Sequence, residues 1–197
     1  EEEGLPQSVH DIPDPDGDLD GHTAEDVAAA YDMLASGRTA GVFQLDGAGM
    51  TRVVQDIRPE NLNDLSATVA LYRPGPISAK MPEDYANRKH GRAEVEYGAL
   101  TTDDEEADWI HSVLDSTYGM CVFQEEAMLL GRVVAGFDDI QRSTLRKAIG
   151  KKKKDLMDKC YDWWMEGSGR EFFEGEQMIS PKFSQDSAQR LWDFIKG

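Results

Sequence analysis

Apolar side chains recur at intervals of three and four residues along most of the chain, which is the spacing of one face of an α-helix. In the segment 24–36, Val27, Tyr31 and Leu34 share such a face, and Thr23 is suited to cap its first turn. The same pattern predicts further helices over 47–57, 62–71, 101–114, 125–134, 140–149, 155–166 and 184–195.

Glycines, prolines and short apolar runs interrupt these helical segments. Gly37 ends the first helix. Pro74 and Pro76 predict an extended turn after residue 71, because proline lacks an N–H and restricts the residue before it. The apolar runs 39–45 and 121–123 are predicted to be short strands. The predicted fold class is therefore mainly α with small β elements.

The chain divides by composition into an acidic start and a folded region. Residues 1–23 are rich in Asp, Glu, Gly and Pro, as in a lead-in or linker, and residues 24–197 carry the helical pattern. No stretch approaches the roughly 18–20 consecutive apolar residues of a membrane span, and the acidic first residues are unlike a signal peptide. We expect no membrane partner.

The two cysteines indicate a reducing compartment. Cys121 and Cys160 belong to no CxxC or Cys/His cluster, so neither a disulfide framework nor a zinc site is predicted. Cys121 lies in an apolar run and is predicted to be a small buried side chain. We therefore expect a cytoplasmic protein.

The net charge of −17 argues against nucleic-acid binding, which needs Lys and Arg, but the charges are segregated. The acids are dense in the first 32 residues and in 101–108, whereas the bases concentrate in 88–92 and 142–154. Such segregation can place a basic face on an acidic molecule.

Five short segments, in the same order and with similar spacing, resemble those of one protein family. They are 41–50 (GVFQLDGAGM), 69–76 (VALYRPGP), 87–92 (NRKHGR), 117–125 (TYGMCVFQE) and 145–153 (LRKAIGKKK). Together they resemble the fingers region of the alpha subunit of bacterial DNA polymerase III, a family C replicative DNA polymerase. The resemblance extends over about residues 25–197 and implies a fingers domain cut at both ends from a longer subunit.

The resemblance implies that the basic end of the helix 140–149 binds the incoming deoxynucleoside triphosphate. The residues it assigns to these contacts are Arg146, Lys147, Lys151 and Lys152. Arg73 is held by the restricted backbone between Tyr72 and Pro74, which suits a guanidinium aimed at a phosphate of the nucleotide; the alternative is an arginine that packs under the loop. Arg142 and Arg146 share a helical face, and a break at Gly150 is expected to present the lysines from a loop. The alternative is a solvated basic helix end that the helix dipole favours.

A second set of cations is assigned to the DNA template-primer. It comprises Arg88, Lys89, His90, Arg92 and Lys153. The compact cluster at 88–92 also suits the triphosphate tail, and solvated surface is the alternative role for its side chains. Gln124 and Glu125 are expected to brace the fold by hydrogen bonding, and the alternative is that they position the incoming nucleotide or the template. Glu126 stands where the family usually has Gln, and Lys147 stands where it has Arg, which indicates a distant branch such as that of a phage.

The resemblance also places the catalytic chemistry outside this chain. A full-length subunit would add deoxynucleotides with Mg²⁺ held by its palm, so we expect no metal on this segment and no activity from it alone. The implied partners are template-primer DNA, deoxynucleoside triphosphates, the palm and thumb of the same subunit and other replisome subunits.

Two aspartate patterns near the start of the chain are rejected as metal sites. Asp14, Asp16 and Asp18 spell a polymerase-like P-D-x-D-x-D, but Pro15 and Gly17 between them are poor strand residues. Neither calcium-loop frame through these aspartates has both the required Gly and the required Glu. We interpret them as part of the acidic lead-in.

A rival hypothesis makes the chain a stand-alone, phage-like, non-catalytic binding module or inhibitor of the replication machinery. Its net charge of −17 fits this hypothesis, because an acidic surface can repel or mimic DNA.

Overall fold

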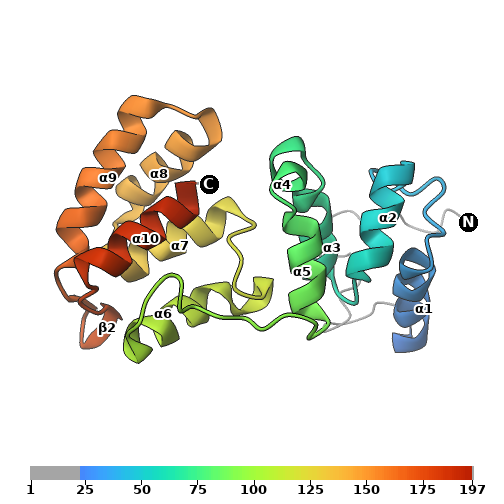
Figure 1. The fold of residues 1–197 in the computed structure, drawn as a ribbon, viewed down its shortest axis with the longest axis horizontal. Helices are drawn as coiled ribbons and strands as arrows, with labels where there is room; N and C mark the ends of the chain where they lie inside the picture. Colours follow the sequence, from blue (N-terminus) through green and yellow to red (C-terminus); the bar gives the residue numbers. More distant parts are fainter. Residues whose placement is uncertain (1–22, 197) are drawn as a thin grey trace, which may run out of the picture. The chain divides into compact units, whose positions relative to one another are not determined.

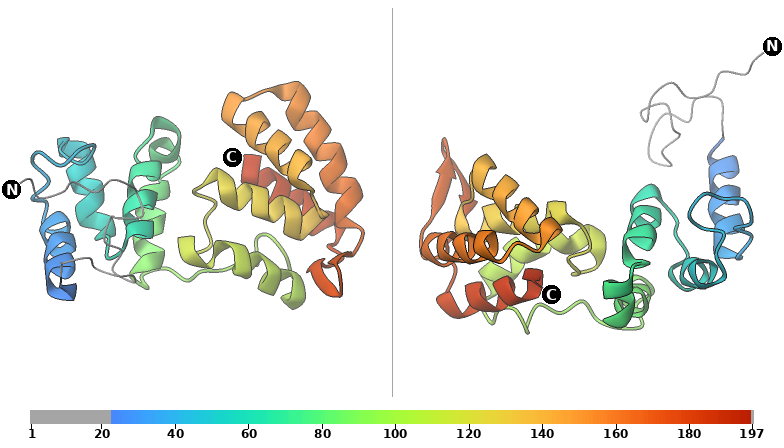
Figure 2. Two further views of the ribbon diagram at one scale, coloured as in Figure 1. Left: turned by 180° about the vertical axis from the view of Figure 1, so that it is seen from behind. Right: turned by 90° about the horizontal axis from the view of Figure 1, so that it is seen from above.

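The computed structural model describes residues 23–196 and divides the chain into two compact units, Glu1–Ala93 and Glu94–Gly197. Figures 1 and 2 show both units as helical assemblies. The region 24–197 expected from the sequence therefore consists of two units, which are considered separately. No helix in the described residues is long and apolar enough to cross a membrane.

Unit 1 contains helices at the predicted positions and two that were not predicted. Its helices are α1 (Ala24–Ala35), α2 (Ala48–Ile57), α3 (Leu62–Leu71), α4 (Pro74–Ser78) and α5 (Met81–Lys89). Thr23 caps α1 by accepting a hydrogen bond from the backbone N–H of Asp26 at 3.1 Å. Gly37 follows α1 with a φ of +84°, which glycine adopts without strain.

The core of unit 1 lies where α2 packs against α1, α3 and α5. Met50 and Val54 of α2 are buried there with Leu34 and Leu45. The strand predicted over 39–45 is wrong, because this segment forms consecutive turns, with Val42 N–H donating to the carbonyl of Thr39 at 3.0 Å. Its apolar residues suggested a strand, but within these turns Leu45 is buried in the core and Phe43 is 85% exposed.

The prolines after α3 begin a helix rather than prevent one. Pro74 occupies the first turn of α4, and Arg73 before it is extended, with φ −133° and ψ 155°. The first helical position tolerates proline because its N–H has no partner within the helix. The predicted extended turn is therefore limited to Arg73 itself.

Unit 2 is a helical bundle with one β-hairpin. Its elements are α6 (Asp104–Leu114), the 3-10 helix η2 (Asp115–Thr117), α7 (Gln124–Ala135), α8 (Asp139–Lys151), α9 (Lys154–Ser168), β1 (Phe172–Glu174), β2 (Gln177–Ser180) and α10 (Gln185–Lys196). Helix α7 packs against α6, α8 and α9, and α10 packs against α9 (Figure 1). Trp164 of α9 is fully buried, and its Nε1–H donates to the carbonyl of Ala188 at 2.9 Å.

The small β content is confirmed, but it lies elsewhere than predicted. The antiparallel pair β1–β2 turns at Gly175, whose φ is +63°. Residues 121–123, predicted as a strand, form irregular backbone leading into α7. Cys121 there is half-buried against the core, and burial followed by the charge of Glu126 raises the pKa of its thiol to about 12.

Candidate nucleotide and DNA interface

Three of the five family-like segments meet in unit 1. Gly49, from the first segment, lies on α2 directly against the hydroxyl of Tyr72 from the second, and a Cβ at position 49 would collide with it. Asn87 and Arg92, from the third, lie at the end of α5 and just beyond it, and Arg92 Nε donates to Asn87 Oδ1 at 2.9 Å. The resemblance in sequence therefore corresponds to one surface of this unit.

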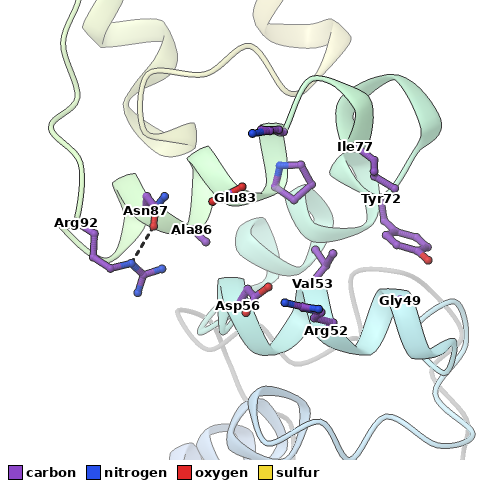
Figure 3. Close-up of a pocket in the computed structure, with 12 residues that line it drawn as sticks. Gly49, Arg52, Val53, Asp56, Tyr72, Ile77, Glu83, Ala86, Asn87 and Arg92 are labelled. Carbon is purple, nitrogen blue, oxygen red and sulfur yellow. Dashed lines mark hydrogen bonds between the residues drawn. The ribbon is translucent and has the colours of Figure 1, made fainter.

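This surface contains a pocket of about 530 Å³ between α2 and α5 (Figure 3). Residues from the helices and from the turns between them line it: Gly49, Arg52, Val53, Asp56, Tyr72, Ile77, Lys80, Pro82, Glu83, Ala86, Asn87 and Arg92. Sequence reasoning missed Arg52 and Lys80. Arg52 is two positions beyond the first family-like segment, but its place on the pocket depends on how α5 packs.

Lys89 is held inside unit 1. Its ammonium donates to the backbone carbonyl of Arg58 at 3.0 Å and to Glu60 at 3.0 Å, and it lies 3.1 Å from Asp64. The side chains of Lys89 and Asp64 are 3% and 2% exposed. Burial opposes its charge, but the two carboxylates outweigh burial and raise the pKa of Lys89. The geometry favours a structural role for Lys89 over the DNA contact predicted for it.

The other predicted cations of unit 1 are more accessible. Arg73 and Arg92 are exposed, and Arg88 and His90 are half-buried at the end of α5. The His90 ring lies 3.2 Å from the carbonyl of Asp56. These four side chains leave a basic edge on unit 1.

The remaining predicted cations come together at the corner between α8 and α9. The expected break at Gly150 is wrong, because Gly150 and Lys151 continue α8 and the chain turns at Lys152, whose φ is +48°. Lys153 precedes α9 and Lys154 begins it. We call the six exposed cations of this corner the basic ridge: Arg146, Lys147, Lys151, Lys152, Lys153 and Lys154.

Ion pairing separates Arg146 of the basic ridge from the other arginines of unit 2. Four of the five arginines within residues 94–196 form salt bridges: Arg132 with Glu174, Arg142 with Asp139, Arg170 with Glu166 and Arg190 with Asp186. Arg146 is the one arginine within residues 94–196 that has no such acid partner, and no ridge lysine has one among the described residues. In a chain with 38 acids and 21 bases, these cations remain available to a ligand.

The helix dipoles favour positive charge at only some positions of the basic ridge. Lys151 and Lys152 lie at the C-terminus of α8, where the dipole favours a positive charge. Lys153 and Lys154 lie at the N-terminus of α9, where positive charge is disfavoured, and no side chain caps that end. Asp155 already places a negative charge in the first turn of α9, so an anionic ligand at this corner would be held mainly by the lysines.

A buried carboxylate shapes the backbone beside the ridge. Glu126 accepts hydrogen bonds from the hydroxyl of Thr117 at 2.6 Å and from the backbone N–H groups of Val122 at 2.6 Å and Phe123 at 2.9 Å. Burial raises the pKa of Glu126 although these hydrogen bonds oppose the shift. The fourth family-like segment is therefore a hydrogen-bonded corner at the start of α7.

This corner meets the fifth family-like segment through Gln124. The Gln124 side-chain amide lies against Gly150 of α8, where a Cβ would be 3.0 Å from Gln124 Nε2. Gln124 thus packs against α8, Glu125 is exposed, and the hydrogen-bonded bracing expected of these two residues stays a prediction. Thr117, Gln124 and Glu126 thus position the backbone on one side of the basic ridge.

No metal-binding cluster of three His, Cys, Asp or Glu side chains occurs in residues 23–196. The aspartate patterns at Asp14, Asp16 and Asp18 lie outside the described residues.

Comparisons with known proteins agree with the family-like segments. Residues 16–171 match the family described as the bacterial DNA polymerase III alpha subunit finger domain. The chain is similar to DNA polymerase III subunit alpha of Aquifex aeolicus, 35% identical over 166 residues that cover 84% of this chain and 13% of that protein. It is also similar to the subunit of the same name from Pseudomonas aeruginosa, 40% identical over 137 residues, 70% of this chain and 11% of that protein. The chain thus spans about an eighth of the length of these relatives.

Proposed function

The chain belongs to the family of bacterial DNA polymerase III alpha subunit finger domains, and we propose that it binds the incoming deoxynucleoside triphosphate and the template DNA of a replicative polymerase. In this proposal unit 2 binds the triphosphate through the basic ridge, and unit 1 contacts DNA. The observation that carries the proposal is that Arg146 and the ridge lysines lack acid partners in a chain of net charge −17.

The ridge has the chemistry that a triphosphate requires. Arg146 presents a planar guanidinium that can donate two parallel hydrogen bonds to one phosphate. Lys147, Lys151 and Lys152 supply point charges around it, and Lys147 keeps the charge of the family's arginine without its two-point geometry. Positioning and charge stabilisation of this kind are the main contributions that a protein makes to phosphoryl transfer.

Unit 1 is proposed to contact the template side. Arg88, His90 and Arg92 would reach DNA phosphates from the basic edge. Arg73 is proposed as a further ligand of the triphosphate, and Lys153 of unit 2 as a separate DNA contact. Phosphate contacts fix the position of DNA without reading its sequence. We assign Lys89 to the fold rather than to DNA because its ammonium already faces three protein oxygens.

Nucleotidyl transfer itself is assigned to a palm outside this chain. In the proposed full-length subunit, palm carboxylates hold Mg²⁺, which supplies the charge that activates the primer hydroxyl. Thumb, palm and further replisome subunits are the proposed partners. This chain alone is expected to bind substrates without extending a primer.

Photocrosslinking of a radiolabelled azido-deoxynucleoside triphosphate to the intact 197-residue chain tests the triphosphate role. Arg146→Ala combined with Lys151→Ala should reduce crosslinking at least tenfold, because each lost charge-assisted hydrogen bond contributes about 1.5–3 kcal/mol. The matched control removes two exposed cations of unit 2 outside the ridge, Arg170 and Lys182, as alanines. Equal crosslinking by both double variants would refute the ridge as the triphosphate site.

A non-catalytic binding module is the second candidate, favoured by the net charge of −17. An acidic module acting on the replication machinery would inhibit primer extension by a family C polymerase when added in trans. It would also be encoded without palm and thumb sequence. A source reading frame that continues into both would exclude this candidate.

A further inference from the structure

The pocket of unit 1 has an apolar end and a cationic end. Tyr72 and Ile77 lie together at one side in Figure 3, and Arg92 with Asn87 lies at the other. Arg52 and Asp56 project from α2 between them. Tyr72 is 39% exposed and Ile77 45%, so the apolar end is open to a ligand. An aromatic wall facing a guanidinium matches a ligand that has both a flat ring and an anionic group.

The charges limit how anionic that ligand can be. Arg52, Lys80 and Arg92 contribute three positive charges and Asp56 and Glu83 two negative ones, which leaves the lining at +1. A triphosphate, with several charges, would be repelled by the two carboxylates, whereas one phosphodiester charge balances the lining. The ligand expected here therefore carries one phosphate charge per aromatic ring.

The pocket cations are free to make that contact. Arg92 uses Nε for the hydrogen bond to Asn87, which leaves its terminal nitrogens without a protein partner in the described residues. Arg52 and Lys80 are exposed and form no ion pair within residues 23–93. Unpaired arginines beside an aromatic ring are the elements of sites for single-stranded nucleic acid.

The aromatic wall is held in place by backbone features. The N–H of Tyr72 donates to the carbonyl of Thr68 at 3.2 Å at the end of α3. Its hydroxyl lies against Gly49, so any larger residue at position 49 would displace the ring. Lys80 has a φ of +58°, a conformation that non-glycine residues rarely adopt. The contact with Gly49 therefore limits where the Tyr72 ring can lie at this side of the pocket.

We propose that this pocket binds an unpaired nucleotide of single-stranded DNA, with the base on Tyr72 and Ile77 and its phosphate between Arg52 and Arg92. The proposal rests on the template-side role of unit 1 and adds that unit 1 distinguishes unpaired from paired template. A free nucleoside monophosphate has the same chemistry and is the other source that the test must separate. The pocket is open, which suits a nucleotide that remains attached to a strand on both sides.

Fluorescence anisotropy of labelled oligothymidylate and of a labelled hairpin duplex, each titrated with the intact 197-residue chain, tests this site. Tyr72→Leu keeps apolar bulk but loses the ring, and should weaken single-strand binding about tenfold while leaving duplex binding unchanged. Tyr72→Phe should retain binding. The matched aromatic control is Phe43→Leu, which changes a ring that is 85% exposed and outside the pocket.

Arg52→Ala keeps the test decisive if Tyr72→Leu impairs folding, because Arg52 is exposed and supports no ion pair in unit 1. It should weaken single-strand binding and reduce the slope of log K against log salt by about 0.7. Arg38→Ala, which removes a cation outside the pocket, is its matched control. Thermal unfolding midpoints measured for all variants identify any loss caused by misfolding.

Three results would overturn the proposal. If Tyr72→Leu and Phe43→Leu reduce the affinity for single-stranded DNA equally, the pocket is not the nucleotide site, while the template-side role of unit 1 still stands. Binding of deoxythymidine monophosphate to the pocket, without displacement of that nucleotide by oligothymidylate, would assign it to free nucleotides. Absence of any DNA binding by the intact chain, to single strand and duplex alike, would remove the template-side role as well.

Discussion

The basic segments 88–92 and 146–154 look alike in the sequence but differ in the structure. In unit 1, Lys89 is enclosed by Glu60 and Asp64, which are 29 and 25 positions earlier in the chain. In unit 2, Arg146 and the ridge lysines are exposed and meet no carboxylate in the described residues. In an acid-rich chain, the carboxylates that the fold brings next to each base decide which cations a ligand can use, and clustering of bases in the sequence does not.

The strongest contrast is expected from neutralising one lysine in each segment. Lys89→Met should lower the free energy of unfolding by about 3 kcal/mol, because it leaves the buried Asp64 carboxylate without its cation. Lys153→Met, on the exposed ridge, should change the same free energy by less than about 0.5 kcal/mol. Urea unfolding of both variants measures the difference, and equal effects would contradict the distinction between the segments.

The pH dependence sharpens this first prediction. The pKa of Lys89 is raised above its ordinary value of 10.5, so its stabilising contribution is complete below pH 10.5 and is lost as the pH rises through the higher folded value. The stability gap between wild type and Lys89→Met should therefore narrow only in strongly alkaline solution. A gap that narrows near neutral pH would argue against an ion pair.

A smaller effect of opposite sign is expected on the ridge at Lys152. Its φ of +48° is a left-handed conformation that costs a non-glycine residue about 1–2 kcal/mol. Lys152→Gly should raise the free energy of unfolding by about 0.5 kcal/mol after the entropy of glycine in the unfolded chain is counted, and should weaken triphosphate binding. Thermal unfolding and nucleotide titration together would show whether stability and binding change in opposite directions there.

The smallest expected effect concerns Glu126 beside the ridge. Burial raises the pKa of Glu126 above the ordinary 4.5. Its contribution to the free energy of unfolding is therefore complete below pH 4.5 and is lost as the pH rises through the folded pKa. Glu126→Gln lacks this titration. As the pH rises, the variant should therefore gain stability relative to the wild type. The difference in unfolding free energy between the two proteins, measured at several pH values, cancels the titration of the groups that they share. A difference that does not change with pH would contradict the raised pKa of Glu126.

The sequence predicted the helices well where their apolar faces and caps are local. Helix α3 has the predicted bounds, and α1 begins after its predicted cap, Thr23. The prediction from the sequence failed where tertiary packing determines the secondary structure. The apolar run 39–45 is a series of turns, and the β-hairpin at 172–180 was not predicted. Short apolar runs fit a strand, a turn or a buried helix equally well, so periodicity cannot distinguish them.

The candidate site could be predicted only in part. The family-like segments identified Arg146 and its neighbours, and the structure adds that they remain unpaired. The burial of Lys89 depends on two acids distant in the chain, and Arg52 and Lys80 join the pocket only through the packing of α2 with α5. Neither fact has a local signal in the sequence.

The central claim is that the unpaired basic ridge binds the triphosphate of a nucleotide. The most direct test is the ratio of the Kd values of a deoxynucleoside monophosphate and the matching triphosphate for the intact chain, measured by calorimetry. The triphosphate should bind at least tenfold more tightly, and Arg146→Ala with Lys151→Ala should bring the ratio close to one. A ratio near one in the wild-type chain, or a ratio that the double variant leaves unchanged, would contradict the account.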